Sequence, residues 1–194
     1  MRWLEPEDIA AATAEPVTVA EAQIQCRIEP TDGENTAILA GLIAAARGYV
    51  EQVTGLKLAA QTLKLRAWDL SEATFSLPIA PVSAISGITY MDANGVQQTL
   101  DPALYTGALY GLSPTISRAY DQNWPAHRCG LGYVTITVTA GYASGACPEP
   151  IKQAILLTVG DWFANRETST EGRFSSIEMV AVDALLANFR RAYV

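Results

Sequence analysis

The sequence predicts an α+β fold, in which a helical bundle-like unit carries an inserted small antiparallel β module. Three observations predict it: apolar residues recur at helical spacing towards both ends of the chain, alternate with polar residues in the middle, and are interrupted there by prolines and glycines. We therefore expect two N-terminal and two C-terminal helices around a β module at residues 61–142. The 194 residues suit a single domain, 1–194.

The first expected helix is short and begins with a capping signal. In VTVAEAQIQCRI, Thr18 and Glu21 have the T-x-x-E spacing of a capping box. In such a box the two side chains satisfy each other's backbone N–H groups at the start of a helix. We expect this helix at about residues 19–27.

The second expected helix is long and has one apolar face. Thr31 and Glu34 repeat the capping-box spacing and predict that a helix begins there. Apolar residues then recur at helical spacing as far as Val53, and Gly55 suits the left-handed residue that follows a helix. Several small residues on its flanks would permit close approach of another helix: Ala37, Ala40, Gly41, Ala44, Ala45 and Gly48.

The middle of the chain reads as short strands. QTLKLRAW, which begins at Gln61, and YVTITVTAGY, which begins at Tyr133, alternate apolar and polar residues with period two. Between them, Asn94 and Gly95 predict a tight hairpin turn in which both residues have positive φ. This segment predicts a small antiparallel sheet or sandwich.

Helices return near the C-terminal end of the sequence. PEPIKQAILLTVGDWFANRE predicts a helix within residues 148–167, with Pro150 in its first turn, where the missing N–H costs nothing. Together with residues 16–57 it would complete the main helical unit. The polar stretch 168–176 predicts a flexible link, and residues 177–194 predict a C-terminal helix.

Charge and composition exclude several classes of protein. The formal net charge is -7, and the first 60 residues hold nine acids and four bases, so the acidity is concentrated there. Nucleic-acid binding needs clustered Lys and Arg, which this chain lacks. No apolar run approaches the length of a membrane span, and the first residues do not resemble a signal peptide. Three widely spaced cysteines predict reduced thiols in a cytosolic protein.

A search for catalytic chemistry finds little. His127 is the single histidine, and no partner group is apparent for it. No motif for a phosphate, a dinucleotide or a metal ion is present, so we expect no cofactor, no metal site and no catalytic residues. Two alternatives stay open beside a structural role: a small hydrolase that uses His127 and one acid, and a protein-interaction module unrelated to viruses.

The order of the segments resembles one known family. EPVTVAEAQIQCRI, LIAAARGYVEQVTG, LPIAPVSAISGITYMDANG and VTITVTAGY follow one another along the chain, and PEPIKQAILLTVGDWFANRE and ALLANFRRAY come after them. This series resembles the head–tail connector (adaptor) proteins of long-tailed bacteriophages, prophages and gene transfer agents. One departure is Asn188, where many relatives carry proline, which concerns the place where the last helix breaks.

The resemblance implies a structural protein of the virion and not an enzyme. Such adaptors, made in the bacterial cytoplasm, form a ring, commonly twelve-fold, below the portal protein of the head. They join the portal to the next ring, the stopper (head-closure) or a tail protein, and DNA passes through the centre during ejection without specific binding. No membrane takes part.

Two sets of residues are candidate sites under this resemblance. The C-terminal segment is similar to the part of these proteins that grips the portal, and in this chain it combines apolar, aromatic and basic side chains; the expected portal-docking residues are Leu185, Leu186, Phe189, Arg190, Arg191 and Tyr193. An acidic surface would let DNA slide past, because like charges repel. The acids that we expect to face the DNA channel are Glu21, Glu29, Asp32, Glu34 and Glu51.

Overall fold

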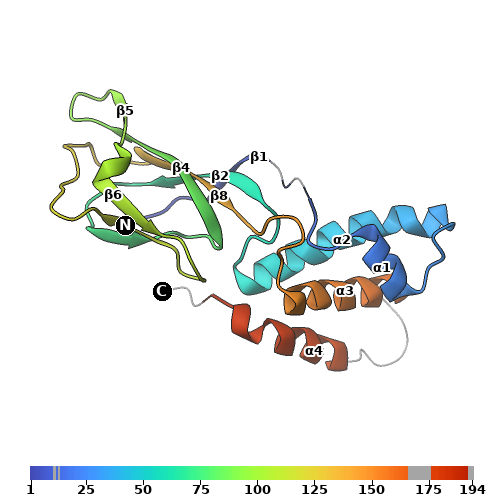
Figure 1. The fold of residues 1–194 in the computed structure, drawn as a ribbon. Coiled ribbons are helices and arrows are strands. Elements are labelled where there is room, and N and C mark those ends of the chain that lie inside the picture. Colours follow the sequence, from blue (N-terminus) through green and yellow to red (C-terminus); the bar gives the residue numbers. More distant parts are fainter. Residues whose placement is uncertain (11, 13, 166–175, 192–194) are drawn as a thin grey trace. The chain divides into compact units, whose positions relative to one another are not determined.

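The chain forms two compact units, each built from separate parts of the sequence (Figure 1). The computed structural model describes residues 1–10, 12, 14–165 and 176–191. The β unit consists of Met1–Thr13 and Ala59–Tyr142, and the helical unit consists of Ala14–Leu58 and Ala143–Val194. The predicted α+β fold is confirmed.

The β unit contains two antiparallel sheets. A five-stranded sheet has the strand order β1-β2-β8-β4-β5, and a three-stranded sheet has the order β3-β7-β6. The strands are β1 (Glu7–Ala10), β2 (Gln61–Ala67), β3 (Thr74–Ser76), β4 (Val82–Met91), β5 (Gln97–Thr99), β6 (Tyr105–Ala108), β7 (Thr115–Arg118) and β8 (Val134–Ala140), with a short 3-10 helix, η1 (Pro102–Leu104), before β6.

Alternation along β2 and β8 builds the core of this unit. The two strands pair so that Leu63 faces Val138 and Leu65 faces Ile136, and all four side chains are buried. Phe75 of the three-stranded sheet belongs to the same buried cluster. The polar residues of β2 and β8 point the other way, as the period of two requires.

Strand β1 is a part of the β unit that the sequence pattern did not reveal. It pairs with β2 at the edge of the five-stranded sheet, and all four of its residues are exposed. An exposed edge strand buries no apolar face, so its sequence carries no alternation. Glu7 forms an ion pair with Arg66 of β2 across this edge.

The hairpin between β4 and β5 differs from the predicted turn. Gly95 has a φ of +84°, but Asn94 does not have a positive φ, so the prediction for Asn94 was wrong. Asp92 organises the turn instead: its carboxylate accepts the backbone N–H groups of Asn94 and Val96 at 2.8 and 2.9 Å. The N–H of Val96 lowers the pKa of the Asp92 carboxyl most, with further help from the Gln98 side chain.

Four α-helices form the described part of the helical unit. They are α1 (Val19–Cys26), α2 (Gly33–Thr54), α3 (Glu149–Ala164) and α4 (Ser176–Leu186), and a 3-10 turn, η2 (Ala187–Phe189), follows α4. Helix α3 contacts each of the other three helices. Its buried residues, among them Ile151, Ile155 and Val159, and those of α2, among them Leu39 and Ile43, supply the core of this unit.

The predicted N-cap is present at the first helix and differs at the second. The capping box of Thr18 and Glu21 is present at the start of α1. The second predicted box is wrong, because Asp32, and not Thr31, caps α2 by accepting the N–H of Asn35 at 3.1 Å. Aspartate is at least as good an N-cap as threonine, and it stands one residue closer to the apolar pattern. Gly55 ends α2 in the left-handed conformation, as predicted.

The C-terminal helix is shorter than its sequence pattern indicated. It ends at Leu186, and the chain is extended at Arg190, where ψ is 127°. Of the expected flexible link, residues 168–175 lie outside the described residues. Among the helices that the structure describes, none combines the length and the apolar character that a bilayer crossing demands.

Candidate functional site

His127, the candidate catalytic base, connects two loops within the β unit. Its Nε2 accepts the backbone N–H of Leu70 at 3.2 Å, and its Nδ1 lies 2.9 Å from the carbonyl oxygen of Pro125. A neutral ring with its proton on Nδ1 satisfies both contacts. Both ring nitrogens are therefore occupied by the backbone, which leaves no lone pair for general-base chemistry in this arrangement.

The thiols of the helical unit are poorly placed for nucleophilic chemistry. All three cysteines are free, and Cys147 is buried. Burial raises the pKa of the Cys147 thiol to about 11 and also raises the pKa of Cys26, so neither forms a thiolate readily at neutral pH. Within the described residues, no group of three His, Cys, Asp or Glu side chains is arranged to hold a metal ion.

The C-terminal segment has a buried side that packs inside the helical unit. Val182 and Leu186 of α4 are 4% and 0% exposed, and α4 contacts α3. Leu185 and Phe189 are half-buried. Leu186 is thus a core residue of the helical unit in this conformation, although we expected it to dock on a partner.

The outer side of the same segment is polar and exposed. Arg190 Nη2 lies 2.7 Å from Asp183 Oδ1, and both side chains are about half exposed, at 47% and 54%. The two residues come from the end and the middle of the segment, so their ion pair holds the turn after α4 against the helix. Exposed ion pairs of this kind contribute little to stability, about 0–1 kcal/mol.

A backbone hydrogen bond fastens the segment to the end of α2. The N–H of Arg191 donates to the carbonyl of Thr54 at 2.9 Å. Thr54 is almost fully buried, and its hydroxyl donates to the Val50 carbonyl at 2.7 Å. Arg191 is therefore placed by its backbone. Tyr193, the last expected docking residue, lies outside the described residues.

Three of the five expected channel acids have structural partners. Glu21 accepts the N–H of Thr18 at 2.7 Å, which is the main reason that its pKa is lowered, and it lies 3.3 Å from Lys152 of α3. Asp32 caps α2. Glu51 lies 3.2 Å from Arg47 and accepts the N–H of Leu58 at 2.8 Å. These contacts account for Glu21, Asp32 and Glu51 without any role towards DNA.

Glu29 and Glu34 are different. Both are exposed, and neither forms an ion pair with a described residue. They stand on either side of the N-cap of α2, in the connection from α1 and in the first turn of α2. A carboxylate in the first turn is stabilised by the partial positive charge of the helix end. Glu29 and Glu34 are the members of the predicted set that are exposed and have no cationic partner among the described residues.

Solved structures share this fold over almost the whole chain. One is described as the neck of an empty GTA particle computed with C6 symmetry; a chain in it matches with a TM-score of 0.79 and 23% identity, covering 98% of this chain and 97% of that one. The chain has the fold of a gene transfer agent neck protein.

Two further structures match this neck-protein fold. A chain of the virion of the native gene transfer agent particle matches with a TM-score of 0.77 and 22% identity, and a chain of the native neck computed with C12 symmetry matches with 0.73 and 24%. In each case 98% of this chain and 97% of the other chain are covered. No protein-family model and no curated protein sequence matches the chain significantly.

Proposed function

We propose that the protein is a head–tail connector (adaptor) subunit in the neck of a phage or a gene transfer agent particle. It forms a ring below the portal, joins the portal to the stopper or a tail protein, and lets DNA pass through the centre. The observation that carries this proposal is the match of 98% of the chain to neck proteins at a TM-score of 0.79. A twelve-fold ring also satisfies six-fold symmetry, so it agrees with both symmetries under which those necks were computed.

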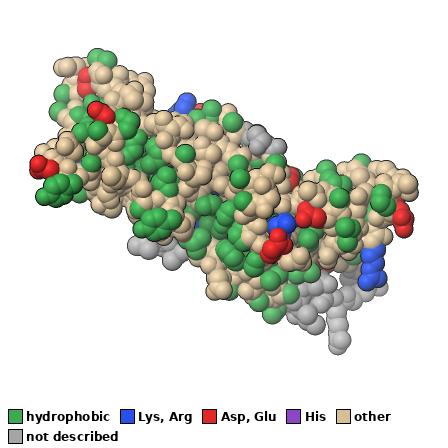
Figure 2. Space-filling model, in the orientation of Figure 1, with side chains coloured by type: hydrophobic (Ala, Val, Ile, Leu, Met, Phe, Trp, Pro, Cys, Tyr) green, Lys and Arg blue, Asp and Glu red, His purple; other side chains and the backbone are tan. Residues whose placement is uncertain are grey.

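The charge distribution supports passage of DNA without binding. The net charge is -7. On the face of the described residues drawn in Figure 2, lysine and arginine side chains lie in small separate groups. Four of the cations, Arg47, Arg66, Lys152 and Arg190, are also held in ion pairs within the chain. Phosphate contacts by clustered cations would slow a moving duplex, and cations that are dispersed or paired within the chain provide fewer such contacts.

The portal-docking role of the C-terminal segment is part of the proposal. Exposed and half-buried residues of the segment, Leu185, Phe189 and Arg190, together with Arg191 and Tyr193, would make the contact; Leu186 could join it only if α4 separated from α3. Aromatic and arginine side chains are the commonest anchors of protein interfaces. The arginines would also suit an acidic groove on the portal.

We expect a chain that lacks residues 190–194 to lose binding to the cognate portal ring, by at least roughly tenfold, while its helical unit stays folded. This deletion spares Leu186 and so leaves the core of the helical unit intact. The measurement is a pull-down of the deleted and full-length chains on immobilised portal rings, with circular dichroism to check folding.

Asp183→Asn is the matched control. It removes the ion pair to Arg190 and leaves every proposed docking side chain in place, so portal binding should be unchanged or stronger. Undiminished binding by the deleted chain would refute the docking role. Failure of the full-length chain to bind portal rings would refute the neck proposal itself.

Glu29 and Glu34 carry the proposed role of the channel acids. Replacing both with glutamine should leave ring assembly intact and reduce DNA delivery per particle several-fold, because less like charge would repel the passing phosphates. The control is Glu149→Gln, since Glu149 is also exposed but is paired with Lys152 at 3.1 Å. Unchanged DNA delivery by the double variant would refute the proposal that Glu29 and Glu34 face the DNA channel.

A further inference from the structure

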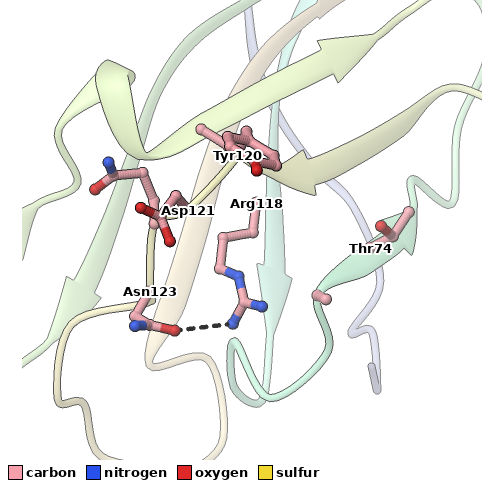
Figure 3. Close-up of a pocket in the computed structure, with 8 residues that line it drawn as sticks. Thr74, Arg118, Tyr120, Asp121 and Asn123 are labelled. Carbon is pink, nitrogen blue, oxygen red and sulfur yellow. Dashed lines mark hydrogen bonds between the residues drawn. The ribbon is translucent and has the colours of Figure 1, made fainter.

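An open pocket in the β unit brings together an arginine, an aspartate and several uncharged polar groups. It has a volume of about 340 Å³ and lies between the start of β3 and the loop after β7 (Figure 3). Its lining residues are Ala73, Thr74, Arg118, Ala119, Tyr120, Asp121, Gln122 and Asn123.

The loop that forms this pocket is held in place by its backbone. The N–H of Arg118 donates to the Ala73 carbonyl at 2.7 Å, and that of Ala119 donates to the Leu104 carbonyl at 2.9 Å. The N–H of Gln122 closes a turn onto Ala119 at 3.2 Å, and Asp121 takes the left-handed conformation, with φ of +55°, to complete it. The side chains of the loop are therefore presented from a fixed frame, which lowers the entropy cost of binding.

Arg118 lies in this pocket without a carboxylate partner among the described residues. One of its terminal nitrogens donates to Asn123 Oδ1 at 3.3 Å, a hydrogen bond that Figure 3 draws as a dashed line. An arginine that meets a neutral amide keeps the remaining N–H groups of its planar fork for a carboxylate, which it can bind through two parallel bonds. Tyr120, at 98% exposed, stands beside it as an aromatic contact surface.

The geometry points to this pocket as the site that receives an acidic segment of a neighbouring copy of the chain. The inference rests on the proposed ring. Copies that each carry a net charge of -7 repel one another, and unpaired cations at the contacts between copies would offset this repulsion. Arg118 is such a cation, and it sits in a preformed pocket.

Within the β unit, residues 5–8 form an acidic segment that fits this description. Glu5 and Asp8 are exposed and form no ion pair with a described residue, whereas Glu7 between them is paired with Arg66. They flank or belong to β1, the edge of the five-stranded sheet, while the pocket lies on the three-stranded sheet. Two different surfaces of one unit that complement each other give a head-to-tail contact, which closes into a ring when the rotation between copies allows it.

Asp121 limits what the pocket can accept. Its carboxylate also lines the pocket, so a free anion meets repulsion as well as attraction. A carboxylate from another copy must therefore approach from the Arg118 side. Asp121→Asn should strengthen the contact between copies, because it removes the repulsion and asparagine tolerates the left-handed conformation.

The test is a charge-reversal cycle, read out as ring formation on portal rings by analytical ultracentrifugation. Arg118→Glu alone, and Glu5→Lys with Asp8→Lys, should each weaken association between copies by at least roughly tenfold. The triple variant should restore it. Arg128→Glu, a reversal at another exposed arginine of the same unit, should assemble like the wild type. Thermal midpoints of all variants check folding, and Arg118→Gln provides a milder change at the same position.

The outcomes separate the two proposals. Wild-type assembly by Arg118→Glu and Arg118→Gln would overturn the pocket assignment, and a triple variant that stays unassembled would overturn residues 5–8 as the occupant. A wild-type chain that forms no ring on the portal would overturn the proposed function, and the pocket assignment with it.

Discussion

Replacing Gly141 with alanine should destabilise the β unit by at least about 3 kcal/mol. Gly141 has a φ of +97°, and a Cβ atom at this position would overlap the carbonyl group of Ala59. The N–H of Gly141 also donates to the Pro81 carbonyl at 2.9 Å, so the backbone cannot move away without losing that bond. Left-handed strain and a clash with backbone atoms therefore add together.

The measurement is chemical unfolding followed by tryptophan fluorescence, since Trp3, Trp68 and Trp124 all belong to the β unit. Gly111→Ala is the matched control. Gly111 has a similar φ of +76°, but nothing lies within 4 Å of the added atom, so this variant shows the cost of the backbone conformation alone, about 1 kcal/mol. Equal losses for the two variants would show that the overlap with Ala59 is relieved at little cost.

Replacing Leu186 with alanine should lower the free energy of unfolding of the helical unit by about 2–5 kcal/mol. Leu186 is fully buried, so the smaller side chain leaves a cavity beside α3. The measurement is hydrogen exchange of the α3 amides, which reports on the helical unit by itself.

The neighbouring residue gives the contrast that separates folding from docking. Leu185 is only half-buried, so Leu185→Ala should cost less stability and should weaken portal binding more. If instead Leu186→Ala left the α3 amides fully protected, the packing of α4 on α3 would contribute little to the helical unit.

The fold was predictable where packing produces a period. The alternation along β2 and β8, and the helical spacing along α2 and α3, follow from one buried face on each element. Strand β1 was not predictable, because all four of its residues are exposed and its pairing with β2 depends on contacts more than 50 residues away in sequence, such as Glu7 with Lys64. The start of α2 was also ambiguous in sequence, because Thr31 and Asp32 are both residue types that cap helices. The position at which the backbone becomes helical makes Asp32 the N-cap.

The candidate site was predictable only in part. The apolar and basic pattern of the C-terminal segment was apparent, but it cannot show which of two adjacent leucines faces inward; the structure places Leu186 in the core and leaves Leu185 at its margin. Likewise, the five acids looked equivalent in sequence, but two of them have ion-pair partners. Glu21 pairs with Lys152, which is distant in sequence, and Glu51 pairs with Arg47, one helical turn away. The Arg118 pocket has no sequence signal, since its walls come from residues 73–74 and 118–123.

The bridge between Ala59 and Tyr142 has a consequence for how such proteins diversify. The chain enters and leaves the main stretch of the β unit at two neighbouring points, so the stretch between them resembles a cassette with adjacent ends. Insertions whose two ends are adjacent disturb the fold of their host least. Exchange of this cassette between related proteins would nevertheless be incomplete without residues 1–13, because β1, which pairs with β2, lies outside the stretch 59–142.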